Sequence, residues 1–187
     1  MCKHTESIRG YFDQATPEQI QAGRDWYERA RSLVFELSMV YGTTEETVAG
    51  VIAALSQRTQ WSTNIDRATR VLDGDDNPGG LPAAADKAIA IRDGADPEDV
   101  LGERAFKIKA FYRALLGDDD ACVIDTWMLD ALDFYKISKV TGERYQSYTA
   151  LQYQKLVDVV KAEARRAGLA ITQYQAAVWC CIRGNAD

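Results

Sequence analysis

A chain of 187 residues, 47% hydrophobic and 27% charged, has the composition of a folded globular protein and a length suited to one domain. Its net charge of −6 disfavours a protein that coats nucleic acid nonspecifically, because such affinity comes mainly from lysine and arginine. No apolar run approaches the roughly 20 residues that cross a bilayer, and the start lacks a secretion signal. We therefore expect no membrane contact and a cytoplasmic location.

Metal and disulfide chemistry are not expected. The four cysteines, Cys2, Cys122, Cys180 and Cys181, have no CxxC spacing, so reduced thiols are expected. The only histidine, His4, lies near a terminus that we expect to fray, and no element is predicted before Thr16. We accordingly predict no metal site. The sequence leaves the oligomeric state open.

The first predicted helix begins after Thr16, which has the position of an N-cap followed by proline at the first helical position. Apolar residues then recur at three- and four-residue steps until Gly42. The next start has the spacing of a capping box at Thr43-Thr44-Glu45-Glu46. Its helix is apolar on nearly every side from 48 to 55, which predicts a central position in the fold.

The rest of the chain is also predicted to be helical. Ser62 is expected to cap a helix that ends at Leu72, before a loop rich in aspartate and glycine at 73–80. Further helices are predicted at about 82–93, 97–101, 103–116, 125–135, 145–167 and 172–183. Only Ala121–Ile124 resembles an extended piece, and it is too short to seed a sheet. We predict an all-α fold, a single compact multi-helix domain over residues 1–187.

Three stretches carry the functional information: Leu55 to Trp61, Leu101 to Lys107, and Val123 to Trp127. In this order they resemble the helical core of the HhH-GPD superfamily of base-excision DNA glycosylases, in its endonuclease III and adenine-glycosylase branch. The likeness spans roughly residues 48–130, with the N- and C-terminal helices expected to pack as a second half. The chain also resembles an uncharacterised, phage-associated helical family, from which we infer no activity.

Spacing supports this resemblance. Leu101 lies six residues before Lys107 and Asp125 lies eighteen after it, which matches the family's separations between hairpin, lysine and catalytic aspartate. The resemblance therefore implies that Asp125 is the catalytic aspartate and that Lys107 has the amine position of bifunctional members. Lys109 is a second candidate for that amine.

The sequence departs from the family at three points. The hairpin positions read Leu101-Gly102-Glu103-Arg104-Ala105, without the family's proline and paired glycines, so the hairpin motif is degenerate. Trp127 replaces the histidine that follows the family's D-T. The four-cysteine tail that holds an iron-sulfur cluster in many relatives is missing, so we expect no cofactor.

Each catalytic candidate has two interpretations. Breaking a base–sugar bond develops positive charge on the sugar, and the carboxylate of Asp125 is suited to stabilise that charge or to activate water. Aspartate is equally a favoured helix N-cap. An amine such as Lys107 can attack the sugar covalently, but a helical lysine is also suited to exposure or to a phosphate contact.

In the resembled family, the first stretch reads roughly L-x-Q-x-T-Q and its polar side chains enter the duplex around a flipped nucleotide; Gln57 and Gln60 match those positions. The candidate nucleic-acid contacts are Gln57, Arg58, Thr59, Gln60, Trp61, Asn64, Arg104 and Lys109. Alternatively, the polar residues of 57–60 cap the carbonyl groups of the preceding helix.

Three functions follow as hypotheses. The first is a glycosylase-like enzyme that acts on a nucleobase or nucleoside flipped into a pocket, with DNA or a nucleoside as partner. The second is an enzyme that hypermodifies a base of phage DNA on the same fold. The third is a non-catalytic helical module that binds nucleic acid or protein.

Overall fold

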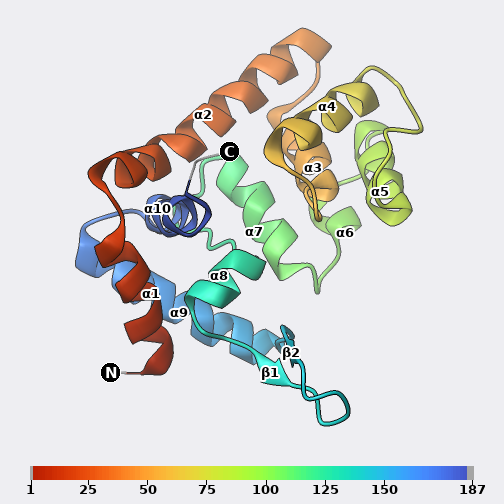
Figure 1. Cartoon of the computed structure of the whole chain (residues 1–187). Coiled ribbons are helices and arrows are strands. Elements are labelled where there is room, and N and C mark those ends of the chain that lie inside the picture. The colour runs from red at the N-terminus through yellow and green to blue at the C-terminus, as the bar shows by residue number, and fades with distance from the viewer. Residues whose placement is uncertain (1, 185–187) are drawn as a thin grey trace. The chain divides into compact units, whose positions relative to one another are not determined.

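The computed structural model describes residues 2–184, which form helices and one short β-hairpin (Figure 1). The helices are α1 (Lys3–Gln14), α2 (Pro17–Tyr41), α3 (Glu45–Leu55), α4 (Trp61–Leu72), α5 (Pro82–Arg92), α6 (Pro97–Leu101), α7 (Phe106–Leu115), α8 (Thr126–Ala131), α9 (Ala150–Ala167) and α10 (Ile171–Arg183). Strands β1 (Lys136–Ile137) and β2 (Arg144–Tyr145) pair antiparallel, Lys136 opposite Tyr145. The predicted all-α class is confirmed.

Contacts within the chain divide it into two units. Of the described residues, unit 1 contains 2–28 and 119–184, and unit 2 contains Arg29–Asp118. Helix α2 contributes its first half to unit 1 and its second half to unit 2. The single domain over 1–187, with a core at about 48–130, stays a prediction.

Helix α3 forms the centre of unit 2. All of its residues from Val48 to Leu55 are buried, and it packs against α4, α5, α6 and α7. Gly50 permits this close packing, because a Cβ there would lie 2.9 Å from the Pro97 Cβ. The predicted central position of this helix is confirmed within unit 2. Its N-cap is Thr44, whose side chain accepts from the Thr47 N–H, one residue later than the predicted capping box at Thr43.

Helix α10 has the corresponding role in unit 1. It packs against α9, α1 and α8. Eight of its residues, among them the fully buried Tyr174, face the interior. Gly23 of α2 lies against its backbone, where a Cβ would come within 2.3 Å of the Ala177 nitrogen. Backbone contact of this kind leaves no room for a side chain.

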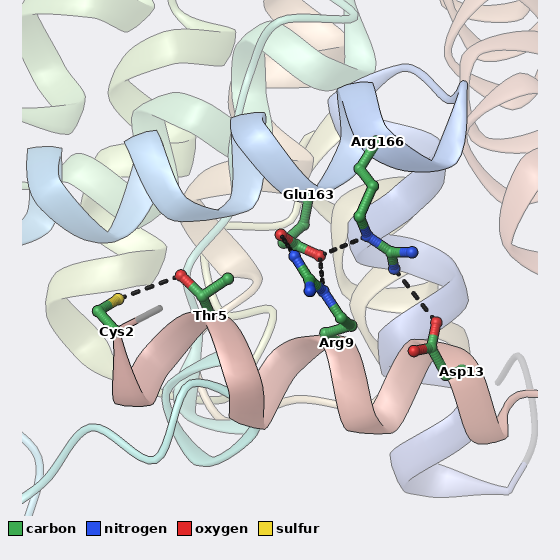
Figure 2. Close-up of polar contacts among 6 residues, drawn as sticks. All are labelled: Cys2, Thr5, Arg9, Asp13, Glu163 and Arg166. Carbon is green, nitrogen blue, oxygen red and sulfur yellow. Dashed lines mark hydrogen bonds and ion pairs between the residues drawn. The ribbon is translucent and has the colours of Figure 1, made fainter.

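A cluster of charged side chains joins α1 to α9 inside unit 1 (Figure 2). Glu163 is 3% exposed, and its two carboxylate oxygens accept from Arg9 at 2.7 and 2.8 Å. Arg166 donates to the same carboxylate at 2.8 Å and to Asp13 at 3.2 Å. The hydrogen bonds from Arg9 lower the pKa of Glu163, burial opposes them, and Arg166 adds to the lowering. The carboxylate is therefore held in its charged form.

The N-terminal segment corrects one prediction. Residues 3–14 form α1, which the sequence reading did not predict, and Ile8 on this helix is fully buried. The His4 ring nitrogen Nδ1 lies 2.6 Å from the Leu132 carbonyl oxygen. The expected fraying around His4 is therefore wrong, because long-range contacts hold a helix whose sequence has weak local signals.

Four helix boundaries also differ from prediction. The helix predicted at 103–116 begins at Phe106. Gln60, not Ser62, is the N-cap of α4. The helix predicted at 125–135 ends at Ala131, shortly before Asp133 adopts a left-handed backbone with φ of 48°. The helix predicted from 145 begins at Ala150, because Thr149 and Gln152 form a capping box while Arg144 and Tyr145 pair in the hairpin.

Candidate functional site

Lys107 is the second residue of α7, and its side chain reaches the C-terminal end of α3. Its Nζ donates to the Ser56 Oγ at 3.1 Å and lies 5.5 Å from the centre of the Phe111 ring. Ser56 is the C-cap residue of α3 and itself donates to the Ala53 carbonyl at 2.8 Å. Two of the three stretches that carry the resemblance, 55–61 and 101–107, therefore meet in unit 2.

The loop between α3 and α4 has an unusual backbone at Arg58. This exposed residue has φ of 53°, a left-handed conformation that costs roughly 1–2 kcal/mol for most residues other than glycine. Thr59 is fixed within the loop, since its Oγ1 donates to the Gln57 carbonyl at 3.0 Å and accepts from Arg67 at 3.0 Å. Gln60 is exposed. Strained residues in loops cluster at sites of binding, which makes Arg58 a candidate contact.

The capping interpretation of residues 57–60 is wrong, because none of these side chains bonds a carbonyl of α3 within residues 2–184. The Thr59 hydroxyl bonds the Gln57 carbonyl, which belongs to the loop, whereas Gln57 and Gln60 have no side-chain hydrogen bond in the same range. The Ser56 hydroxyl, which the sequence reading did not single out, bonds a carbonyl of α3 instead.

Trp61 and Asn64 both lie on α4 but differ in exposure. The Trp61 ring meets the Phe111 ring edge to face, with centroids 6.4 Å apart, and remains partly exposed. Asn64 is 2% exposed, and its side-chain nitrogen donates to the Ile52 carbonyl at 3.1 Å. Burial of this kind is at odds with the predicted nucleic-acid contact, and Asn64 instead ties α4 to the central helix.

The basic residues at and shortly after positions 101–105 differ in how their charges are balanced. Lys109 and Arg113 both pair with Glu98, at 2.6 and 2.9 Å. Burial is the largest influence on Glu98 and raises its pKa, but the bonds from Arg113 and Lys109 together outweigh it, so the pKa lies below its ordinary value. Arg104 is exposed and has no ion pair within residues 2–184. Arg104 is therefore the member of this group whose charge no ion pair within residues 2–184 balances.

Asp125 lies in unit 1, whereas the other nine candidate residues lie in unit 2. Its carboxylate accepts from the Met128 N–H at 2.8 Å, so the predicted N-cap role is confirmed. The side chain remains partly exposed. Burial raises the pKa of the neighbouring Tyr148, and the negative charge of Asp125 raises it further. Asp125 is thus a helix cap whose charge also acts on the side chain of Tyr148.

The segment before Asp125 is anchored from both sides in unit 1. The Val123 N–H donates to the Gln175 side-chain oxygen at 2.7 Å, and the Tyr153 hydroxyl donates to the Cys122 carbonyl at 2.7 Å. Gln175 also donates to the Tyr27 hydroxyl at 2.8 Å. These bonds fix where α8 begins and so fix the position of the Asp125 carboxylate.

A cavity of about 670 Å³ in unit 1 contains none of the predicted residues. Its wall is made by α1, α8 and the hairpin, and consists of Ser7, Tyr11, Asp130, Asp133, Tyr135, Arg144, Tyr145 and Gln146. The cavity could not be predicted from the sequence, because residues 145–167 were predicted to form one helix and no helix was predicted before Thr16. Aromatic residues at 135 and 145 on either side of a glycine-containing turn were the available signal of a hairpin.

Two classes of site are missing from residues 2–184. No group of three or more histidine, cysteine, aspartate or glutamate side chains in this range is arranged to hold a metal ion. Within the same range, no helix combines the length and the apolar character that a membrane span requires.

Comparisons with known proteins give one match. A family model described as "Family of unknown function (DUF7178)" matches residues 2–186. Neither the comparison with curated proteins nor that with solved structures found a match.

Proposed function

Since the chain belongs to this family of unknown function, we propose its activity from its own residues: a glycosylase-like enzyme that acts on a nucleobase or nucleoside in DNA. The observation that carries the proposal is the 3.1 Å contact between Lys107 and Ser56. It joins the loop that contains Gln57 and Gln60 to the start of α7, and both belong to the stretches on which the resemblance rests.

In this proposal, basic side chains of unit 2 contact the DNA backbone. Arg58 and Arg104 are exposed and have no ion pair within the described part of the chain, and Lys107 adds a third positive charge. Helix α7 begins at Phe106 without a side-chain cap, and uncapped N–H groups at a helix start attract phosphate. Because the net charge of −6 of the whole chain opposes nonspecific contact, binding is expected to be local and sensitive to salt.

Lys107 is assigned to a phosphate contact in this proposal. A hydroxyl acceptor and an aromatic ring both interact favourably with a positive charge, whereas attack on a sugar requires a neutral amine. The contacts therefore favour the phosphate interpretation over the covalent one. Water is then the group that replaces the base on the sugar.

Asp125 is assigned to the chemical step, on the basis of its spacing from Lys107 in the sequence. The base leaves with the electron pair of the base–sugar bond, and positive charge develops on the sugar ring. A carboxylate stabilises that charge and accepts one proton of the attacking water, while a proton from solvent neutralises the departing base. Base and sugar are the products, and no cofactor is required. We place the reaction in the cytoplasm.

Asp125→Asn tests the chemical step. Asparagine caps helices as well as aspartate does, so the substitution removes the charge and keeps the bond to the Met128 N–H. Release of bases from DNA that carries varied modified bases should fall by about 100-fold or more. Asp96→Asn is the control, because Asp96 also caps a helix, α6, by accepting from a backbone N–H, that of Glu98, and its substitution is expected to leave the rate unchanged. Undiminished release by Asp125→Asn would exclude this residue as catalytic.

Lys107→Ala tests the phosphate assignment. DNA affinity should fall, and the slope of its salt dependence should decrease by about one phosphate contact. Lys109→Ala is the control, because Glu98 already pairs with that charge and a smaller effect is expected. A borohydride-trapped adduct that disappears in Lys107→Ala would instead establish the covalent mechanism. DNA binding without base release from any substrate would establish the non-catalytic module.

A further inference from the structure

The cavity of unit 1 has walls that suit a ligand. It has about 670 Å³, within the range of roughly 300–1,000 Å³ typical of small-molecule sites. Ser7 and Tyr11 come from α1, Asp130 comes from α8, and the remaining residues come from the segment that includes the hairpin. Helices and a paired hairpin therefore hold most of its side chains in place.

Two positive charges lie near this cavity, and one of them pairs with a carboxylate while the other contacts a neutral ring. Lys3 pairs with Asp133 at 2.7 Å and lies 5.0 Å from the centre of the Tyr135 ring. The Arg144 guanidinium lies 4.1 Å from the centre of the same ring. Two cations thus interact with one tyrosine, and one carboxylate is neutralised by Lys3.

The acceptors of the cavity remain available. Asp130 accepts from the side-chain nitrogen of Gln146 at 2.7 Å, and that nitrogen also donates to the Thr126 carbonyl at 3.2 Å. A neutral amide donor leaves the charge of Asp130 unbalanced, and Asp130 has no ion pair within residues 2–184. Because the Gln146 nitrogen is used in both of these bonds, its side-chain oxygen is left as a second acceptor.

Aromatic surface and backbone strain add to this pattern. Tyr11 is 36% exposed and Tyr145 48% exposed on the cavity wall. Asp133 has φ of 48°, which is uncommon for a residue other than glycine, and strained residues of this kind cluster at ligand clamps. Carboxylates with nearby tyrosine rings recognise positively charged nitrogen groups through ion pairing and cation–π contact.

We propose that this cavity binds a small free organic cation that carries a primary amine or a guanidinium, with Asp130 as its ion-pair partner. The positive group donates to the Asp130 carboxylate and to the Gln146 oxygen, and Tyr11 and Tyr145 contact its apolar stem. This site is independent of the proposed glycosylase-like function.

Calorimetric titration with agmatine, which has an amine at one end and a guanidinium at the other, tests the proposal. The protein should bind agmatine, and 1,4-butanediol, its neutral analogue, should not bind. Asp130→Asn should weaken agmatine binding at least about tenfold, the loss expected for a hydrogen bond to a charged group. Asp158→Asn is the matched control, because Asp158 also accepts from a glutamine amide, at 3.1 Å, but does not line the cavity.

The proposal would be overturned by no binding of agmatine, by equal affinity in Asp130→Asn, or by equal affinity for 1,4-butanediol. If N-acetylarginine amide binds more tightly than agmatine, the natural ligand is an arginine side chain of a protein and not a small free cation. Tyr145→Leu keeps the test decisive if Asp130→Asn fails to fold, since it should also weaken agmatine binding. Lys107→Ala should leave agmatine binding unchanged, which separates this test from that of the proposed enzyme.

Discussion

Unit 1 and unit 2 each contain a glutamate that bridges two cations, and the two clusters differ in burial. The Glu163 side chain, between Arg9 and Arg166, is 4% exposed, whereas the Glu98 side chain, between Lys109 and Arg113, is 36% exposed. Water therefore screens the second cluster more than the first. Equal counts of ion pairs therefore do not imply equal contributions to stability.

The apolar cores of the two units differ in a similar way. In unit 2, α3 is buried on all sides from Val48 to Leu55, and no residue of this stretch is charged. In unit 1, the buried Glu163, Thr172 and Gln175 each bond to another element of the unit. Unit 1 thus depends more on polar bonds between elements, and unit 2 more on close apolar packing.

Two helical glycines give the largest expected effect. Gly23→Ala places a Cβ 2.3 Å from the backbone nitrogen of Ala177, whereas Gly50→Ala meets the side chains of Pro97 and Ile91 at 2.9 and 3.1 Å. Side chains can shift and a helix backbone cannot do so locally. Gly23→Ala should lower the free energy of unfolding by about 3 kcal/mol. Gly50→Ala should lower the free energy of unfolding by about 1 kcal/mol or less, because the higher helix propensity of alanine offsets part of the cost of the close contact. Urea denaturation followed by circular dichroism measures both, and equal losses would contradict the proposed difference.

The glutamates give the next effect. Glu163→Gln should lower the free energy of unfolding at pH 7 by about 2 kcal/mol, since it removes charged hydrogen bonds from a buried site. Glu98→Gln, the matched change in the exposed cluster, should cost less than about 1 kcal/mol. The same urea experiment decides between them. A larger loss for Glu98→Gln would reverse the ranking of the two clusters.

Lowering the pH should weaken the contact between α1 and α9 before it weakens the packing of α3. The pKa of Glu163 is lowered below its ordinary value of 4.5, so its contribution is complete above about pH 4.5 and is lost as pH falls through the lower folded pKa. Hydrogen exchange of α1 and α9 peptides should accelerate, relative to α3 peptides, when pH is lowered from 7 to 3 after correction for intrinsic rates. Glu163→Gln should abolish most of this difference. Persistence of the full difference in that variant would assign it to other carboxylates.

Arg58→Gly gives the smallest effect on stability and the sharpest test of strain in unit 2. Glycine adopts φ of 53° at no steric cost, so the free energy of unfolding should rise by up to about 1 kcal/mol. DNA affinity should fall at the same time, because a phosphate contact is removed. Arg70→Gly is not an equivalent control, since Arg70 pairs with Asp75; Arg165→Ala, an exposed arginine of unit 1, is suitable. Unchanged DNA affinity in Arg58→Gly would leave the strain without a functional explanation.

Several local features could be predicted because their causes are local. Thr16 accepts from the Gln19 N–H, and Gln19 accepts from the Thr16 N–H, as the predicted start of α2 requires. Apolar periodicity predicted the extent of α2, and uniform apolarity predicted the burial of α3. The N-cap role of Asp125 also follows from its position before Thr126.

Tertiary structure alone decided the features that depend on distant partners. Helix α1 is held by Glu163 and Leu132, which lie more than a hundred residues away, so its own sequence has weak signals. The same is true of the cavity, whose walls join residues 7 and 11 to residues 130–146. Lys107 meets Ser56 across 51 residues, which spacing along one helix cannot indicate. Capping and periodicity act within a few residues, whereas ion pairs and cavities require the chain to have folded back on itself.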